Sequence, residues 1–426
     1  MSADTALPCD CPQDGGGLSR RRFLQALGVA GAATAAGPLV STRAAFASSG
    51  TWSGPVLVVL SLRGGFDGLS AVAPVGDPDY QHLRPSIGVP LSSALPTGDR
   101  LFGLHPALAP LKPLWDAGAM AAVHAVGTPD LSRSHFTATE ELERAAPGTS
   151  LRTGWLDRVL GAVGTGTVFE AVQLGQGSPA PLLAGPAPAL AASTLAGFTL
   201  EGTDWLGSRM TDVLHAFHDT SVLPAAAPAR LALAALSSVT SIVGAALPPQ
   251  NGAVYPTGSD LGTALSDAAT LVRAGAGVQA ITIDVGDWDL HSGLGAAGGG
   301  QMATKLADLS ACLAAFAQDL GPATFDRVNV VTVSEFGRRA GENGSGGADH
   351  GHGNAVLMLG GGLVGGRVHG SWPSLAPAAL DHGDLAGTTD YRNVLAELLV
   401  RRFSLPSTAV AGVFPGLVVA PVGVVA

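Results

Sequence analysis

Short apolar runs rich in β-branched residues alternate along the chain with longer segments in which apolar residues recur every three or four positions. The short runs predict buried strands at Val56–Leu60, Ala121–Val126, Phe169–Leu174, Val278–Val285, Val328–Val333 and Ala355–Leu359. The longer segments predict helices at Pro106–Ala117, Phe136–Ala145, Arg230–Val243, Ser259–Ala274, Met302–Leu320 and Tyr391–Phe403. Strands that alternate with helices indicate an α/β fold, with a mainly parallel central sheet covered by helices on both faces.

Two segments depart from this alternation. Residues 175–255 are rich in Ala, Pro, Gly and Leu and contain no cluster of candidate ligands, so we expect a largely helical insertion there. Residues 408–426 carry no charge and resemble a membrane span in composition, but Pro415 and Pro421 argue against a helix. We therefore expect a buried strand or a packed tail, and no transmembrane segment in the mature chain.

The N-terminus has the features of a targeting segment. Ser19–Gln25 contains three consecutive arginines and resembles the twin-arginine export signal. A weakly apolar stretch over residues 26–40 follows, and Ala45–Ala47 fits the small-residue cleavage pattern. We expect residues 1–47 to be a signal peptide and residues 48–426 to form one domain, which the twin-arginine machinery delivers to the periplasm, the cell envelope or the outside of the cell. The alternative is an amphipathic or membrane-anchoring helix.

Composition narrows the range of partners. Only 13% of the residues are charged, the net charge is −10, and no basic run exists beyond Arg20–Arg22, so we do not expect nucleic acid as a partner. An acidic protein can still bind an anionic substrate where metal ions supply positive charge. Because Cys9 and Cys11 lie in the predicted signal peptide, Cys312 remains alone, and the mature chain is expected to lack an intramolecular disulfide.

Two groups of acidic residues and histidines follow predicted strands. The first comprises Asp287, Asp289 and His291, directly after the run Val278–Val285. Ligand sites in open α/β sheets collect at the carboxyl ends of the strands, and three candidate ligands so close together favour a metal site. The alternative is a solvated acidic turn.

The second group comprises Asp349, His350 and His352, in a glycine-rich segment whose flexible backbone can wrap around an ion. Glu335 precedes it, after the strand predicted over Val328–Val333, and is a candidate ligand or supporting acid. Carboxylate and imidazole ligands suit zinc or manganese best, with magnesium or calcium as further candidates. The alternative is a mobile loop with solvated histidines.

Two further motifs carry candidate chemistry. After the first predicted strand, Asp67 is a candidate metal ligand and Arg63 could bind an anionic group, although this motif equally fits a simple turn. Ser132 and Ser134 precede a predicted helix, where backbone donors and the helix dipole favour an anion, and a serine there, beside Arg133, could act as a metal-activated nucleophile. The alternatives are that Ser132 or Ser134 is only a helix cap and that His135 is a ligand.

Seven short motifs therefore occur in order along the chain: Leu62–Gly68, Leu104–Pro106, Ser132–Phe136, Asp287–His291, Ser334–Arg338, Asp349–Gly353 and Thr389–Arg392. This ordered set resembles the bacterial domain-of-unknown-function family 1501, over about residues 54–420. Members of that family typically carry twin-arginine signals, and they are grouped with the alkaline phosphatase and sulfatase superfamily.

The resemblance implies an alkaline phosphatase-like fold that holds one or two divalent metal ions. It also implies Ser134 as the nucleophile, with Arg63 or Arg133 steadying a transferring phosphate or sulfate group. Either Glu335 or Asp349 would be the acid that follows the later strand. The C/S-x-P-x-R context of formylglycine sulfatases is missing. The ligands implied by position are Asp67, Asp287, His291, Asp349 and His350, with His352 beside them.

Three functions are therefore retained as hypotheses. The first is an exported, metal-dependent hydrolase that acts on a phosphate or sulfate ester, either a small molecule or a polymer-attached group. The second is a non-catalytic metal-binding or envelope assembly protein on the same fold. The third is a surface or envelope partner protein that docks through the loops around residues 175–255.

Overall fold

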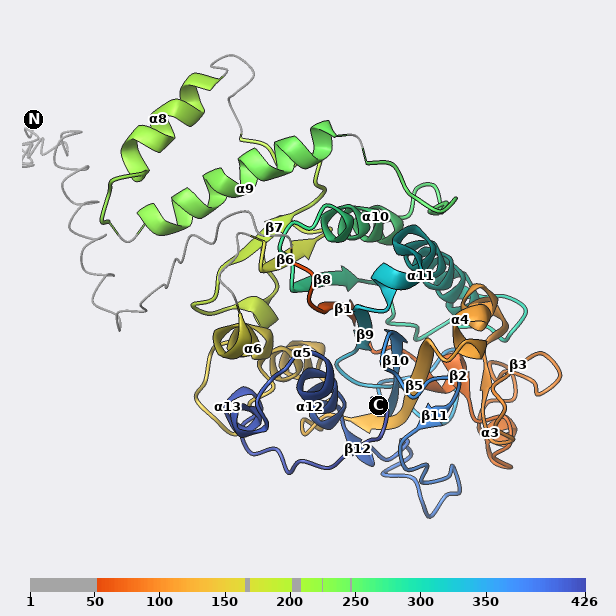
Figure 1. Cartoon of the computed structure of the whole chain (residues 1–426). Coiled ribbons are helices and arrows are strands. Elements are labelled where there is room, and N and C mark those ends of the chain that lie inside the picture. Colours follow the sequence, from red (N-terminus) through yellow and green to blue (C-terminus); the bar gives the residue numbers. More distant parts are fainter. Residues whose placement is uncertain (1–51, 165–168, 201–207, 224, 246) are drawn as a thin grey trace, which may run out of the picture. The chain divides into compact units, whose positions relative to one another are not determined.

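The computed structural model describes residues 52–164, 169–200, 208–223, 225–245 and 247–426 (Figure 1). The chain divides into two units, Met1–Thr42 and Arg43–Ala426. The predicted signal peptide, residues 1–47, lies outside the described residues. All the described helices and strands belong to the second unit.

A nine-stranded sheet forms the centre of this unit, in the order β11-β5-β10-β9-β1-β8-β6-β7, with β12 pairing with β5. Only β10 runs antiparallel to its neighbours, β5 and β9, while every other pairing in this sheet is parallel. The prediction of a mainly parallel sheet is therefore confirmed. The strands are β1 (Val56–Leu62), β5 (Met120–Gly127), β6 (Ala171–Leu174), β7 (Ala189–Ala192), β8 (Ala280–Val285), β9 (Val328–Val333), β10 (Asn354–Gly360), β11 (Val368–His369) and β12 (Thr389–Asp390).

Both faces of the sheet are covered by helices, as Figure 1 shows. Alternate residues of β1 point to opposite faces, so Val58 and Leu60 join one apolar core while Leu57 and Val59 join another. The first core includes α10 (Asp260–Arg273) and α11 (Gln301–Phe325), together with the 3₁₀ helix η2 (Pro106–Leu111). The second includes α5 (His135–Arg144), α6 (Trp155–Val163), α12 (Tyr391–Arg402) and α13 (Val410–Val413).

Five of the six predicted helices form as single helices, and α10 and α12 begin at capping side chains. Ser259 accepts a hydrogen bond from Gly262 N at the start of α10, and Asp390 accepts one from Arg392 N at the start of α12. The helix predicted over Pro106–Ala117 is divided into η2 and α4 (Lys112–Asp116). Prolines within this stretch lack the N–H groups that a continuous α-helix needs.

A small second sheet lies in the connection between β1 and β5. It pairs β4 (Gly103–Leu104) with β2 (Val72–Ala73) and β3 (Leu95–Pro96), beside the short helices α2 (Gly68–Ala71) and α3 (Tyr80–Leu83). Strands this short have no periodicity that a sequence pattern could reveal.

The segment predicted as a helical insertion, residues 175–255, contains η3 (Pro181–Leu183), α8 (Ser208–His218) and α9 (Ala226–Gly244). It also contains β7, which extends the main sheet beyond β6. Among the described residues, one helix, α9, is long and apolar enough to cross a membrane by length and composition.

The C-terminal tail is packed against the body. After the 3₁₀ helix η4 (Ser407–Ala409) and α13, the chain ends with Val424 and Val425 buried, and Val425 forms a bridge with Leu363. Cys312, on α11, is a buried free thiol.

Candidate metal centre

Loops from three neighbouring strands meet at the carboxyl edge of the sheet, next to the start of α5. The loop after β8 is tied to the loop after β1, because Trp288 N donates to Arg63 O at 3.0 Å. It is tied to the glycine-rich loop after β9 through Ala348 N, which donates to Leu290 O at 3.2 Å. Residues far apart in the sequence are thus held side by side, where parallel α/β sheets place their ligand sites.

Two glycines make this close approach of the loops possible. A Cβ atom on Gly64 would lie 2.6 Å from the backbone nitrogen of Asp289, and one on Gly65 would lie 2.6 Å from the Phe336 ring. Both residues also have positive φ angles, +115° and +73°, which side chains strongly disfavour.

The centre of the site is a cluster of imidazole and carboxylate groups. Potential ligand atoms of His135, Asp289 and His350 all lie within 4.8 Å of one another. The His350 Nε2 atom is 3.1 Å from Asp289 Oδ1, and the His135 Nε2 atom is 3.4 Å from Asp289 Oδ2. His291 adjoins them, with its Nε2 atom 3.0 Å from Asp289 Oδ1 and 3.0 Å from His350 Nε2.

Each of these three histidines has its Nδ1 atom beside an oxygen acceptor. Because a carboxylate or carbonyl oxygen only accepts, Nδ1 carries the ring proton in each neutral imidazole, and Nε2 keeps its lone pair. Three Nε2 lone pairs therefore gather around one carboxylate, that of Asp289. The Nδ1 pairs are His135 with Glu335 Oε1 at 2.8 Å, His350 with Arg133 O at 2.9 Å, and His291 with Asp349 Oδ1 at 3.0 Å.

The two supporting carboxylates are themselves held in place. Glu335 is buried, and its Oε1 atom also accepts a hydrogen bond from Gly64 N at 2.8 Å. The Asp349 Oδ1 atom accepts a bond from Asn343 Nδ2 at 3.0 Å. Hydrogen bonds from Asn343 and His291 lower the pKa of Asp349. Such outer partners fix the orientation of metal-binding imidazoles.

Arg338 is a fully buried cation that supports Asp289. Its Nη2 atom donates to Asp289 Oδ1 at 2.6 Å, and its other nitrogens donate to Gly65 O at 2.7 Å and Ala348 O at 3.0 Å. Burial acts to raise the pKa of Asp289, but the hydrogen bond and the positive charge of Arg338 act against it, and the pKa is lowered to about 2. Asp289 is therefore a carboxylate at any physiological pH.

The geometry of the cluster fits a divalent metal ion. Tetrahedral zinc with bonds of about 2.0–2.1 Å places its ligand atoms about 3.3 Å apart, close to the separations around Asp289. The His135 Nε2 atom is also buried without a hydrogen-bond partner within the part of the chain that the structure describes. His135, Asp289, His291 and His350 could thus hold one ion. The described residues contain one such group of three or more ligands.

Two residues expected as ligands lie apart from this cluster. Asp67 is buried, and both of its oxygens accept hydrogen bonds from Arg84, at 2.6 and 3.0 Å. The Asp287 side chain is 95% exposed, and the nearest cation, Lys305 Nζ, is 4.0 Å away. The backbone of Asp287 is left-handed, with φ +66°, and the chain turns there before Asp289.

Residues expected to bind the substrate are already paired with acids. The Arg63 guanidinium bonds to Asp284 Oδ1, at 2.9 Å, and to Glu143. The Arg133 side chain forms an ion pair with the buried Asp384, while its backbone carbonyl supports His350.

Two other candidates border the cluster. Ser134 is the N-cap residue of α5, makes no side-chain capping bond and directly precedes His135. His352 lies outside the cluster, with its Nε2 atom 2.9 Å from Thr128 O.

Sequence reasoning missed two parts of the site. His135 entered only as an alternative to Ser134, although a histidine that opens a helix after a strand is a usable signal. Arg338 belongs to the motif Ser334–Arg338, but nothing in the sequence marks an arginine as buried against an acid elsewhere in the chain.

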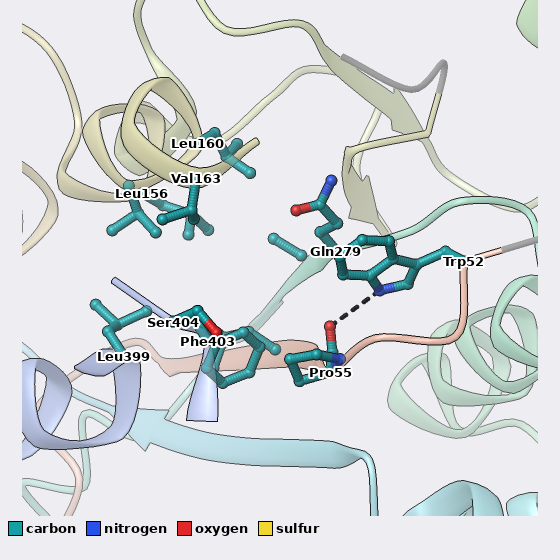
Figure 2. A pocket seen from close by; sticks show the side chains of 12 residues that line it. Trp52, Pro55, Leu156, Leu160, Val163, Gln279, Leu399, Phe403 and Ser404 are labelled. Carbon is teal, nitrogen blue, oxygen red and sulfur yellow. Dashed lines mark hydrogen bonds between the residues drawn. The ribbon is translucent and has the colours of Figure 1, made fainter. Parts of the chain in front are cut away.

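A separate cavity lies at the opposite end of the sheet, near the amino ends of β1 and β8 (Figure 2). It has a volume of about 140 Å³ and mainly apolar walls, which include Trp52, Leu156, Leu160 and Phe403. None of the candidate site residues lines it. This cavity and the cluster at the carboxyl edge of the sheet are therefore separate features.

A family model described as "Protein of unknown function (DUF1501)" matches residues 117–399. This range includes the whole His135, Asp289, His291 and His350 cluster, together with Glu335, Asp349 and Arg338. Searches of curated proteins and of solved structures find no match. Because the family model covers well over half of the chain, the protein belongs to the DUF1501 family.

Proposed function

We propose that this protein is an exported metal-dependent hydrolase that acts on a phosphate or sulfate ester. The observation that carries the proposal is the convergence of three imidazole Nε2 atoms on Asp289, each with its Nδ1 atom held by an oxygen acceptor. The resemblance of the Asp/His motifs to the alkaline phosphatase and sulfatase superfamily, with the fold that it implies, supports an ester substrate. Zinc suits this ligand set best, followed by manganese.

In this proposal, different residues of the chain would balance the charge of the metal ion and hold its ligands in position. A bound divalent ion supplies Lewis-acid catalysis and lowers the pKa of water toward neutrality. Asp289 would offset the charge of such an ion, while Arg338 holds the carboxylate in place. Phe336 packs against the rings of His135 and His350, with centroids 4.9 and 4.7 Å away, and restricts their rotation.

Ser134 is the nucleophile of this proposal, because it sits at the start of α5 next to the cluster. Arg133 would bind the anionic group, since its side chain is more exposed than that of Arg63. Full ester hydrolysis by a Ser134→Ala variant would assign the attack to water instead.

The second candidate is a non-catalytic metal-binding or envelope assembly protein that uses the same cluster. The observation in its favour is that both candidate anion-binding arginines are already paired with carboxylates, Arg63 with Asp284 and Glu143, and Arg133 with Asp384, so that each is less able to bind an anionic ester. Such a protein would bind metal stoichiometrically but hydrolyse no ester.

Metal content decides between these candidates and a protein without metal. The protein is purified without chelators and analysed for bound elements, beside a His135→Ala/His350→Ala variant and a His82→Ala control, which removes an exposed histidine elsewhere. We expect about one equivalent of zinc or manganese in the wild type and the control, and little in the double variant. A folded wild type that takes up no metal would end both proposals.

Catalysis is then tested with p-nitrophenyl phosphate and p-nitrophenyl sulfate. Activity that a chelator removes and zinc restores supports the hydrolase. Bound metal without turnover of any ester in a broad screen supports the non-catalytic alternative.

A further inference from the structure

A helical hairpin extends beyond the β7 edge of the sheet (Figure 1). It consists of α8, α9 and the described connecting residues 219–223 and 225, and the two helices contact each other. Ala235 and Val239 of α9 belong to the main apolar core, so the hairpin is anchored to the body through one side of α9. None of the residues of the metal cluster lies on it, so its role is independent of the proposed function.

Large apolar side chains are exposed at the end of this hairpin where the two helices join. Phe217 is 70% exposed, Val222 is 98% exposed and Leu223 is 69% exposed. Single exposed apolar residues are ordinary, but three at one projecting end form a patch that indicates a binding surface. We call these three residues the hairpin tip.

The exposed side of α9 carries no charge. Residues 231–245 contain no ionisable side chain, and their exposed positions are Ala232, Ser237, Thr240, Ser241, Val243, Gly244 and Ala245. A helix that faces water normally carries charged or polar residues on that side, and here only hydroxyl groups supply the polarity. By its length and composition, α9 is apolar enough to cross a bilayer. Only 22% of its most apolar stretch is buried in the described structure.

Arg230 bridges two backbone carbonyls next to the hairpin tip. The Arg230 Nη1 atom donates to His218 O at 2.6 Å and to Ser221 O at 3.1 Å, so its charge is directed at the backbone of the tip. The other formally charged residues of the hairpin are Arg209, Asp212 and Asp219, which leave it without net charge when histidines are neutral.

We propose that the α8–α9 hairpin binds a lipid membrane surface, with the hairpin tip inserted at the boundary between headgroups and acyl chains. Apolar side chains at the end of the hairpin suit this boundary, where burial of apolar area supplies the affinity. Three side chains at a projecting end are too few for the roughly 800 Å² that each partner of a stable protein interface buries. The net charge of the chain, −10, opposes binding to anionic lipid.

Vesicle flotation with the full protein tests this proposal. The wild type is expected to float with phosphatidylcholine vesicles, with little dependence on salt, and to bind less when anionic phosphatidylglycerol is added. A Val222→Asp/Leu223→Asp variant is expected to lose about tenfold or more of the binding, because two inserted apolar side chains become charged. Since both side chains are exposed, its thermal unfolding should match that of the wild type.

The matched control is Leu91→Asp/Val418→Asp, which adds the same charges at apolar residues that are 70% and 83% exposed elsewhere. This control should bind vesicles as the wild type does. Equal loss in both variants would show a general charge effect and overturn the proposal. So would a wild type that fails to float, or one whose tip drives dimer formation in light scattering without binding vesicles.

Discussion

Asp289 is the residue on which the candidate metal centre depends. One of its oxygens accepts from Arg338, and both oxygens lie within 3.4 Å of an imidazole nitrogen. The surrounding residues Glu335, Asp349 and Arg133 would not touch the ion, but their oxygens decide which nitrogen of each histidine keeps its lone pair. They therefore influence the metal affinity of the cluster.

Substitution of Glu335 tests most directly whether the residues that hold the Nδ1 atoms affect metal binding. In a Glu335→Gln variant the charge beside His135 Nδ1 is lost, so the imidazole becomes a weaker ligand. We expect zinc affinity to fall by about 10- to 100-fold, measured by competition with a chelating dye. Glu342→Gln is the matched control, because Glu342 bonds to Ser86 and Ile87 away from the cluster. Unchanged affinity in Glu335→Gln would remove Glu335 from this role.

His124 provides a prediction on pH and stability. It is fully buried on β5, accepts a bond from Ala125 N and contacts Val72 O, and burial lowers its pKa to about 4. The unfolded chain, with a pKa near 6.5, binds the proton first, so stability is present above about pH 6.5 and is lost as the pH falls toward 4. We expect this histidine to account for about 2 kcal/mol of lost unfolding free energy between pH 7 and pH 5. Urea unfolding of His124→Gln should show a loss smaller by that amount, and an identical loss in both proteins would contradict it.

For the motif Asp287–His291, the sequence does not predict which of the two acids faces the cluster. Their residue types and their place after a strand predict a site, and Asp289 and His291 do lie in it. Which of two acids spaced by one residue faces the cluster depends on the backbone, here on the left-handed φ of Asp287. Nothing in the residue types of this motif indicates that angle.

At the scale of elements, the turn after β1 is fixed by a buried ion pair. Asp67 precedes α2, and Arg84 follows α3, so their pairing joins the end of β1 to the small second sheet. Arg84 also donates to Ala340 O and Arg339 O, which places the glycine-rich loop against the same pair.

An Asp67→Asn variant separates this structural role from a role as metal ligand. Removing one charge leaves Arg84 buried and unpaired, so we expect a loss of about 3 kcal/mol in unfolding free energy, measured in urea. Bound metal should be unchanged by elemental analysis. Asp287→Asn, at an exposed acid, should alter neither quantity. Loss of metal at normal stability would instead make Asp67 a ligand.

Strands of the main sheet with several consecutive buried residues could be predicted from the sequence, whereas strands of two residues could not. Six strands of the main sheet appear as apolar runs, and four of them, β1, β5, β9 and β10, are buried along their whole length. The short strands β2, β3, β4, β11 and β12 have two residues each and carry no pattern. Their positions are decided by the packing of neighbours far away in the sequence.

At the scale of the whole molecule, the match to the DUF1501 family covers residues 117–399. The predicted cellular location of the protein depends instead on its N-terminal sequence. We propose that the twin-arginine pathway exports the protein. An Arg20→Lys/Arg21→Lys/Arg22→Lys change keeps the charge but removes the paired arginines, so the precursor should remain inside the cell. Cell fractionation and immunoblotting measure this, with Arg43→Lys as the control. Export of the triple variant at the normal level would argue for another route.

The order of strands in the sheet also constrains how the protein comes to be folded. β1 lies between β8 and β9, so Leu57 pairs with Ala280 and Val56 with Val328. During synthesis the first strand of the sheet is therefore made long before either neighbour exists. One of its edges stays open until β8 has emerged, and the other stays open until β9 has emerged. Such non-local pairing slows folding and exposes the chain to aggregation. Nascent chains that end before residue 333 should depend on chaperones that cover β1.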